Sequence, residues 1–220
     1  MSRSEVEREI QRQISLAREA EDGTWITYLM RDPRRPDLRG NVAGWPVYVG
    51  QTDDFGNRVR NHLRKSEKLA RKGSGIKYRL KSLLHAGVVP NFEVLDRQPT
   101  RLRSLLSETN YARLCRARGY DIANRTTLQN VAGPPVTMED LPAKWFRSFT
   151  IEQAIADGLE VVTVCRECHE QVRVPATSFQ SLPYKTLGEI LKDDQLRSAP
   201  CSLCEATDSR RVLFRLSTPD

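Results

Sequence analysis

Apolar positions along the chain switch between helical and strand periodicity, and these switches outline its elements. Ser4 and Glu7 have the spacing of a capping box, and apolar residues then recur every three or four positions, which predicts an amphipathic helix over residues 4–20. Strand-like segments at 24–30 and 46–52 follow, separated by a long basic loop rich in glycine and proline. The pattern also predicts helices over 55–72, 76–86, 100–118 and 150–158, and strands over 92–95, 161–164, 172–174 and 212–216.

The periodicity fades between residues 131 and 145, which predicts a domain boundary. Gly133, Pro134, Pro135 and Pro142 interrupt any regular element in this segment. Helices and strands are mixed on both sides of it, so an α+β protein is expected. The predicted organisation is an N-terminal helix in 1–22, a first domain in 23–132, a linker in 133–150 and a second, smaller domain in 151–220.

Charge is distributed unevenly between the two domains. The formal net charge is +7 and the pI about 9.3, yet residues 151–220 hold 8 Lys+Arg against 11 Asp+Glu. The densest basic stretch, residues 58–81, has ten Lys+Arg and only Glu67 to oppose them. A solvated helix face would account for such a run, but its place in a strongly basic domain favours a polyanionic partner such as DNA.

Four of the five cysteines form two pairs, Cys165-x-x-Cys168 and Cys201-x-x-Cys204. The first 22 residues lack the apolar core of a secretory signal, and no apolar run reaches the roughly 18 residues of a membrane span, so we expect an intracellular, cytoplasmic protein. In that compartment paired cysteines are typical of zinc ligands. The second domain is therefore predicted to be a zinc-ribbon-like module with a closed, structural Zn²⁺ site, with His169 as an alternative ligand.

Two interpretations of this module stay open. It can contact DNA through some of its arginines, namely Arg166, Arg173, Arg210 and Arg211. Its acidic balance would also suit docking on another protein or on the first domain, and DNA-site recognition is the interpretation that we favour of the two.

Candidate chemistry is concentrated in the first domain, around Tyr48, Gly50, Arg58 and His62. Arg58 and His62 are four positions apart, so they share a face of the predicted helix. Arg58 offers a planar, permanently charged clamp for phosphate oxygens. His62, with an unperturbed pKa near 6.5, is a natural proton acceptor.

Glu108 is the candidate metal ligand of this domain. It lies at the edge of an apolar stripe on the helix predicted over 100–118. A carboxylate held there can bind Mg²⁺ and leave most coordination sites to water and phosphate. The alternative is a solvated residue that offsets the arginines of the same helix.

Together these positions resemble the GIY-YIG nuclease family, whose catalytic domain is a small, mainly antiparallel sheet of three strands flanked by helices, with one divalent metal. The resemblance covers about residues 24–130, with Ile26 in place of the first family glycine and a longer loop between the two motifs. The first motif falls on Ile26-Thr27-Tyr28, the second on Tyr48-Val49-Gly50, and the remaining family positions on Arg58, His62, Glu108 and Asn124.

The resemblance implies roles for the two tyrosines. Tyr28 would be the general base or a water-positioning group, and Tyr48 would position the water or the phosphate. A phenol with a pKa of about 10 is a poor base unless a nearby cation lowers that value, so His62 stands as the alternative base.

The activity that the resemblance implies is Mg²⁺-dependent DNA endonuclease activity, of a restriction or mobile-element type. DNA is the expected partner, and a homodimer is one way to cut both strands. The basic residues expected to contact DNA are Arg34, Arg35, Arg60, Arg64, Lys65, Lys68, Arg71 and Lys72. The alternatives are a non-catalytic DNA-binding protein that retains the fold, and an adaptor whose zinc module binds a protein partner.

Overall fold

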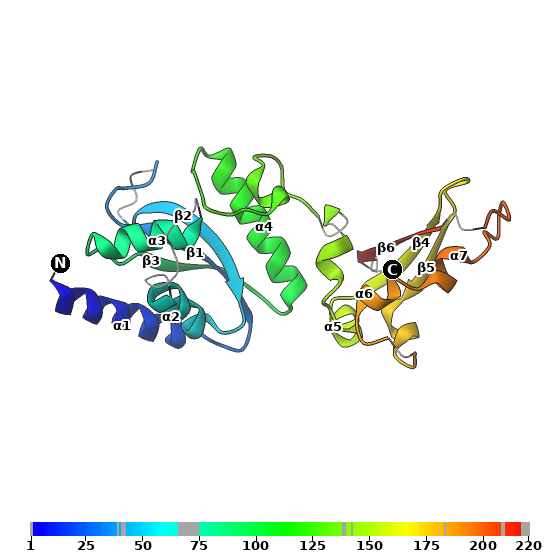
Figure 1. Cartoon of the computed structure of the whole chain (residues 1–220), viewed down its shortest axis with the longest axis horizontal. Helices are drawn as coiled ribbons and strands as arrows, with labels where there is room; N and C mark the ends of the chain where they lie inside the picture. The colour runs from blue at the N-terminus through cyan, green and yellow to red at the C-terminus, as the bar shows by residue number, and fades with distance from the viewer. Residues whose placement is uncertain are drawn as a thin grey trace. The chain divides into compact units, whose positions relative to one another are not determined.

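The computed structural model describes residues 2–38, 40, 43–65, 75–137, 140–141, 143–182, 184–207 and 210–216. The chain divides into two compact units, residues 1–135 and 136–220. Each unit holds one three-stranded antiparallel sheet with helices, so the fold is α+β (Figure 1). None of the described helices combines the length and the hydropathy that crossing a bilayer requires.

The first sheet has the strand order β2-β1-β3, built from β1 (Trp25–Asp32), β2 (Trp45–Thr52) and β3 (Asn91–Gln98). In its register Tyr28 pairs with Gly50 and Met30 with Tyr48. Because side chains alternate across a strand, Tyr28, Tyr48 and Gly50 lie on one face. Leu29 lies on the other face.

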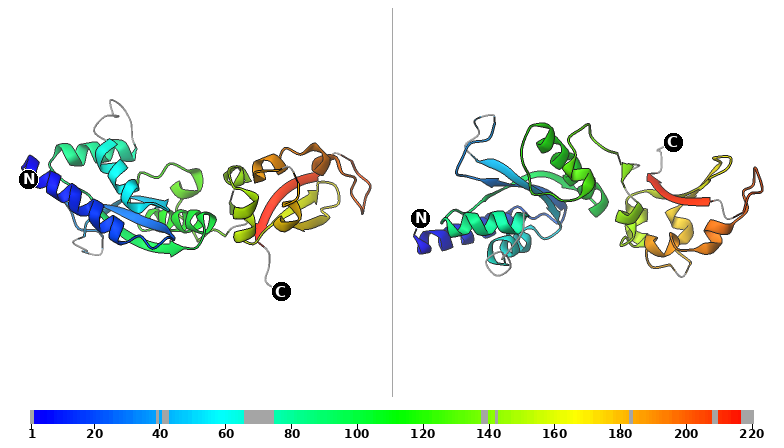
Figure 2. Two further views of the ribbon diagram at one scale, coloured as in Figure 1. Left: turned by 90° about the horizontal axis from the view of Figure 1, so that it is seen from below. Right: turned by 45° about the horizontal axis from the view of Figure 1, so that its top comes forward.

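Helices cover both faces of this sheet (Figure 1). They are α1 (Arg3–Glu19), α2 (Phe55–Lys65), α3 (Ile76–His85) and α4 (Arg101–Ala117), followed by the 3₁₀ helix η1 (Thr127–Asn130). On the face of Tyr28, Ile10 and Ile14 of α1 join Val59 and Leu63 of α2 in one core, so α1 packs along α2 (Figure 2). On the other face, α4 packs against the sheet.

One helix starts earlier than predicted, and another starts where it was predicted to start. The capping box of α1 is formed by Ser2 and Glu5, two positions before the pair expected from the sequence, and both of its hydrogen bonds are present. An earlier start adds intrahelical hydrogen bonds at little further cost once the helix is nucleated. The helix predicted over 55–72 begins at Phe55; its last predicted positions, 66–72, lie outside the described residues.

The second sheet has the order β5-β4-β6, built from β4 (Leu159–Cys165), β5 (Gln171–Pro175) and β6 (Arg210–Leu216). Its short helices are η3 (Ala143–Phe146), α5 (Ile151–Ala156), η4 (Ala176–Phe179), α6 (Leu187–Ile190) and α7 (Asp194–Ser198). Part of the predicted linker, 133–150, belongs to this unit, because Phe146 and Phe149 are buried and the Phe146 ring centroid lies 5.5 Å from that of Phe214.

Candidate active site and metal centre

The Tyr28 hydroxyl is the centre of a polar cluster in an otherwise apolar core. Tyr28 is completely buried in β1, and its Oη lies 2.8 Å from Nε2 of His62. Nε of Arg58 donates a hydrogen bond to the same Oη at 3.1 Å. Arg58 and His62 both reach Tyr28 because they are one turn apart on α2. The structure thus brings together three of the residues singled out in the sequence.

The donor and acceptor roles in this cluster follow from its chemistry. An arginine only donates, so the Tyr28 oxygen accepts from Arg58, whereas the direction of the hydrogen bond between Tyr28 and Nε2 of His62 is set by the tautomer of the imidazole. Burial, together with the neighbouring charge of Arg58, lowers the pKa of His62 to about 3. The imidazole is therefore neutral at neutral pH, and in the tautomer that carries its proton on Nδ1 its Nε2 accepts the Tyr28 proton.

Tyr48 completes the cluster from β2. Its ring centroid lies 6.3 Å from that of Tyr28 and 5.7 Å from that of His62, and its hydroxyl shares a hydrogen bond with the Arg58 guanidinium. Burial raises the pKa of Tyr28 and of Tyr48, so both are neutral phenols at neutral pH. Burial alone would lower the pKa of Arg58, but the two phenol oxygens outweigh it and raise that pKa, which keeps the guanidinium charged.

Gly50 makes room for this arrangement. A Cβ at this position would lie 2.5 Å from Oη of Tyr28 and 2.7 Å from Cε1 of Tyr48. Both distances are well below van der Waals contact, so any larger residue displaces one of the two phenols. The glycine of the Tyr48-Val49-Gly50 segment is therefore required by side-chain packing.

Glu108 is buried on α4, with 8% of its surface exposed. Burial raises the pKa of its carboxyl to about 7, although a hydrogen bond from Gln129 and the charge of Arg58 act in the opposite direction. The alternative of a solvated Glu108 is wrong. Its charge also raises the pKa of Tyr48, so the carboxylate belongs to the same electrostatic cluster.

Asn124 supports the site from outside the cluster. Its side chain is buried, its Oδ1 accepts from Val49 N at 3.0 Å, and its Nδ2 donates to Val49 O at 2.9 Å. Ala123 N donates to Val47 O at 2.7 Å, so this segment runs along the outer edge of β2. Asn124 therefore positions Tyr48 and Gly50 by pairing with an edge strand that would otherwise be open.

Gln129 has no signal in the sequence that marks it as a site residue. It is buried in η1 and hydrogen-bonds Glu108, 21 positions away. This contact exists only because η1 packs on α4, and nothing in the local pattern around Gln129 indicates it.

The residues expected to contact DNA differ in their availability. Asp32 binds the Arg34 guanidinium, with Nε of Arg34 2.9 Å from Oδ1, and Glu7 binds Arg64. Arg60 is exposed, and Arg35 lies over the Trp45 ring. Nothing is described of the Lys65 side chain, and Lys68, Arg71 and Lys72 lie outside the described residues.

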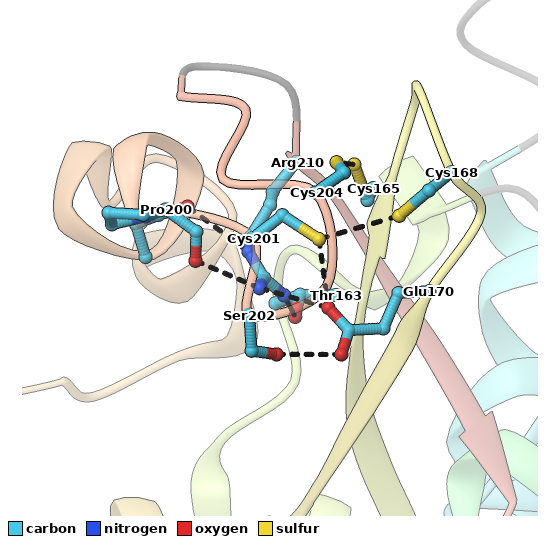
Figure 3. Close-up of polar contacts among 10 residues, drawn as sticks. Thr163, Cys165, Cys168, Glu170, Pro200, Cys201, Ser202, Cys204 and Arg210 are labelled. Carbon is cyan, nitrogen blue, oxygen red and sulfur yellow. Dashed lines mark hydrogen bonds and ion pairs between the residues drawn. The ribbon is translucent and has the colours of Figure 1, made fainter.

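The four paired cysteines form a second site, in the second unit (Figure 3). Their Sγ atoms all lie within 4.8 Å of one another, with 3.7 Å between Cys165 and Cys204 and 3.4 Å between Cys168 and Cys201. Four thiolates around a zinc ion with bonds of about 2.3 Å would be about 3.8 Å apart. The cluster can therefore hold a metal ion such as zinc. Among the described residues it is the only such group of three or more His, Cys, Asp or Glu side chains.

The two cysteine pairs are held by equivalent backbone turns. His169 donates its N–H to Cys165 O, and Glu205 donates its N–H to Cys201 O, at 3.1 and 2.9 Å. Both residues have positive φ, 63° and 59°. His169 itself is exposed and is not among the clustered ligands. The two knuckles are thus local copies of one turn, which points their four sulfur atoms at a common centre (Figure 3).

An ion pair between the buried Arg210 and the partly exposed Glu170 supports the second knuckle (Figure 3). Arg210 has 6% of its surface exposed and donates to the carbonyls of Ala199 and Pro200 at 3.1 and 3.0 Å. It also lies 3.5 Å from Glu170, whose carboxylate accepts from Ser202 Oγ at 2.6 Å. The interpretation of Arg210 as a DNA contact is therefore wrong, because its guanidinium is used inside the unit.

Comparison with protein-family models, with curated proteins and with solved structures finds no match to this chain. Its function is therefore inferred from the geometry of the two sites.

Proposed function

We propose that the first unit is a Mg²⁺-dependent DNA endonuclease of the GIY-YIG type. The observation that carries this proposal is the placement of the Tyr28 hydroxyl between the Arg58 guanidinium and the His62 imidazole, inside a core that is otherwise apolar. A fully buried phenol held by a cation and a neutral base is costly to build for stability alone. Such a cluster is typical of a site that moves protons.

Arg58 is the phosphate-binding group in this proposal. Its Nε is taken by Tyr28, which leaves other N–H donors of the guanidinium for phosphate oxygens. The two phenols orient it before a substrate arrives, so little reorganisation is needed as negative charge develops on the phosphoryl group. Its permanent charge makes this contribution independent of pH near neutrality.

The proton transfer combines the two candidate bases. Tyr28 is too weak an acid to exist as a phenolate at neutral pH, so it cannot act as a base by itself. Within the hydrogen-bonded chain, the phenol oxygen takes a proton from the attacking water while the phenol proton passes to Nε2 of His62. The resulting hydroxide attacks phosphorus, and the bond from phosphorus to the leaving oxygen breaks. The incoming phosphate offsets the charge of Arg58, which favours protonation of His62.

Glu108 is the residue that would hold Mg²⁺. A single buried carboxylate with a raised pKa gains from a neighbouring divalent cation, and Mg²⁺ is commonly bound by one or two carboxylates plus water and phosphate oxygens. The ion would supply charge neutralisation at the leaving oxygen. Gln129 holds the carboxylate in place for this role.

DNA is the substrate that the charge distribution favours. The net positive charge lies in the first 150 residues, and Arg58 stands at the start of their densest basic stretch. Binding that neutralises backbone phosphates releases counterions, so affinity should fall steeply with salt.

Substituting Arg58 or Arg60 by alanine tests the proposal. Both are on α2, but Arg60 is exposed and outside the cluster. We expect Arg58→Ala to reduce Mg²⁺-dependent cleavage of duplex DNA by about a hundredfold or more while most binding remains. At saturating DNA, Arg60→Ala should keep the cleavage rate within a few-fold of the wild type, because the loss of one expected DNA contact weakens binding and leaves the chemical step intact. Equal cleavage rates for the two variants would show that Arg58 takes no part in the reaction. Binding without any cleavage by the wild type would leave a DNA-binding protein instead of an enzyme.

We further propose that the four-cysteine cluster holds a structural Zn²⁺. Its sulfur spacing suits a tetrahedral ion, and four thiolates leave no open coordination position for catalysis. The ion would join the two knuckles that begin at Cys165 and Cys201 and so contribute to the folding of the second unit.

A further inference from the structure

A cavity of about 460 Å³ opens in the first unit between α3 and the segment that follows β1. Val47 and Leu83 form apolar parts of its wall, and the other lining residues are polar or aromatic. The residues of the polar cluster around Tyr28 do not line it, but Val47 directly precedes Tyr48 on β2. The cavity is therefore a separate space beside the candidate active site.

Arg35 is a preorganised cation at this cavity. Its guanidinium carbon lies 3.6 Å from the centroid of the Trp45 ring, a cation–π contact that restrains the side chain. The Trp45 ring is in turn held edge-on by Tyr120, with centroids 5.1 Å apart. Among the described residues Arg35 has no hydrogen bond or ion pair, so its N–H donors are open to an anionic ligand.

Tyr78 adds an aromatic surface to the same cavity. It lies on α3, lines the cavity and has 55% of its surface exposed, so its ring is accessible to a ligand. An exposed aromatic ring beside an arginine is a frequent device for stacking nucleobases. Ser82, one turn further along α3, contributes a hydroxyl that can donate or accept.

The cavity's carboxylate does not repel an anion strongly, because it is already neutralised. Asp32 accepts from Nε of Arg34 and from the Arg34 backbone N–H, at 2.9 and 3.0 Å. Arg79, which also lines the cavity, is paired with Asp121. Asp32 also interacts electrostatically with Arg35, so two arginines face this one carboxylate, and Arg35 keeps N–H donors for an anion because it makes no hydrogen bond among the described residues.

We propose that this cavity binds one unpaired nucleotide of a DNA substrate, with its phosphate on Arg35 and its base on Tyr78. The volume is in the range of sites for small ligands, which suits a single nucleotide and excludes a duplex. The proposal rests on the assignment of the first unit as a DNA endonuclease and narrows its substrate. It predicts a preference for DNA with a single-stranded branch, overhang or bulge over continuous duplex.

Fluorescence anisotropy with the full chain tests this preference without cleavage, in buffer that contains no added divalent metal. The probes are a labelled duplex with a single-stranded overhang, the same duplex with blunt ends, and the overhang duplex with abasic sites in the overhang. We expect tighter binding of the overhang duplex, and a loss of roughly tenfold for Tyr78→Ala, the size expected for one base–aromatic stack. Tyr78→Phe, which keeps the ring, should stay within about twofold of the wild type.

The abasic probe separates the two contacts. It should bind Tyr78→Ala and the wild type equally, because no base is left to stack, whereas Arg35→Gln should weaken binding of both overhang probes. If Tyr78→Ala binds the overhang duplex as the wild type does, or weakens the blunt and overhang duplexes equally, the proposal is overturned. An inactive wild type would sink only the nuclease assignment, since this binding preference is measured independently of cleavage.

Discussion

Replacing Glu108 by glutamine should make the protein more stable and less active at the same time. The carboxyl of Glu108 has an ordinary pKa of 4.5 and a pKa of about 7 in the folded chain, because burial disfavours its charge. Glutamine keeps the size of the side chain and can still hydrogen-bond Gln129, but it never ionises. The variant therefore removes an ionisable group whose charged form is destabilised by burial.

The size and sign of the effect follow from proton linkage. The folded wild type binds this proton more tightly than the unfolded chain, so its stability falls as pH rises from about 4.5 to about 7 and then stays level. At about 1.4 kcal/mol for each tenfold change in the ionisation constant, the loss approaches about 3 kcal/mol. Glu108→Gln does not lose this stability as pH rises, because glutamine does not ionise. Its advantage over the wild type should therefore grow by up to about 3 kcal/mol between acidic and alkaline pH.

Urea unfolding at about pH 5 and about pH 8.5 measures this difference. Trp25 and Trp45 are in the first unit and Trp145 is in the second, so both proteins should carry Trp145→Phe to make tryptophan fluorescence report on the first unit alone. The midpoints should separate at the higher pH, with the variant more stable. A difference between the two proteins that does not change with pH, or a variant that is less stable at about pH 8.5, would refute the reasoning.

Three further outcomes are expected. The pKa of His62 falls from 6.5 to about 3 on folding, so the stability of the first unit should be lost as pH drops through that interval. His62→Gln should remove this part of the acid sensitivity. Parallel pH profiles of the wild type and the variant in urea unfolding would contradict this prediction. Gly50→Ala should destabilise the first unit by about 1–3 kcal/mol, because the added Cβ meets the Tyr28 hydroxyl. A variant that unfolds and cleaves as the wild type does would show that the phenols can move. Removal of the metal by a chelator should unfold the second unit, as seen by Trp145 fluorescence, while the first unit keeps its unfolding transition, and Cys201→Ser should have the same effect. A purified chain that contains no zinc and still gives the same Trp145 signal would argue against a structural ion.

Features that depend on short-range spacing were accessible from the sequence. The strand-like segments that became β1 and β2, the four-residue spacing of Arg58 and His62, and the paired cysteines each reflect local geometry that neighbouring residues determine. The structure adds that two of these local features meet, because Arg58 and His62 both reach Tyr28.

Features that depend on long-range packing could not be predicted in the same way. The burial of Glu108 requires η1 and its Gln129 to pack on α4, and the role of Asn124 requires its segment to run beside β2. Arginine is usually exposed, but Arg210 is buried because its guanidinium donates to two backbone carbonyls and lies beside Glu170. In each case the contact joins residues that are far apart in the chain, so neither periodicity nor propensity carries information about it.

The most direct test of the central claim is the conversion of supercoiled plasmid by the purified chain at about pH 8 with Mg²⁺. Phosphodiester hydrolysis at the Tyr28 cluster predicts nicked or linear product that is abolished by metal chelation and by Glu108→Gln, although that variant is the more stable protein. Plasmid that stays supercoiled with the wild type, or is cut equally well by Glu108→Gln, would contradict the account.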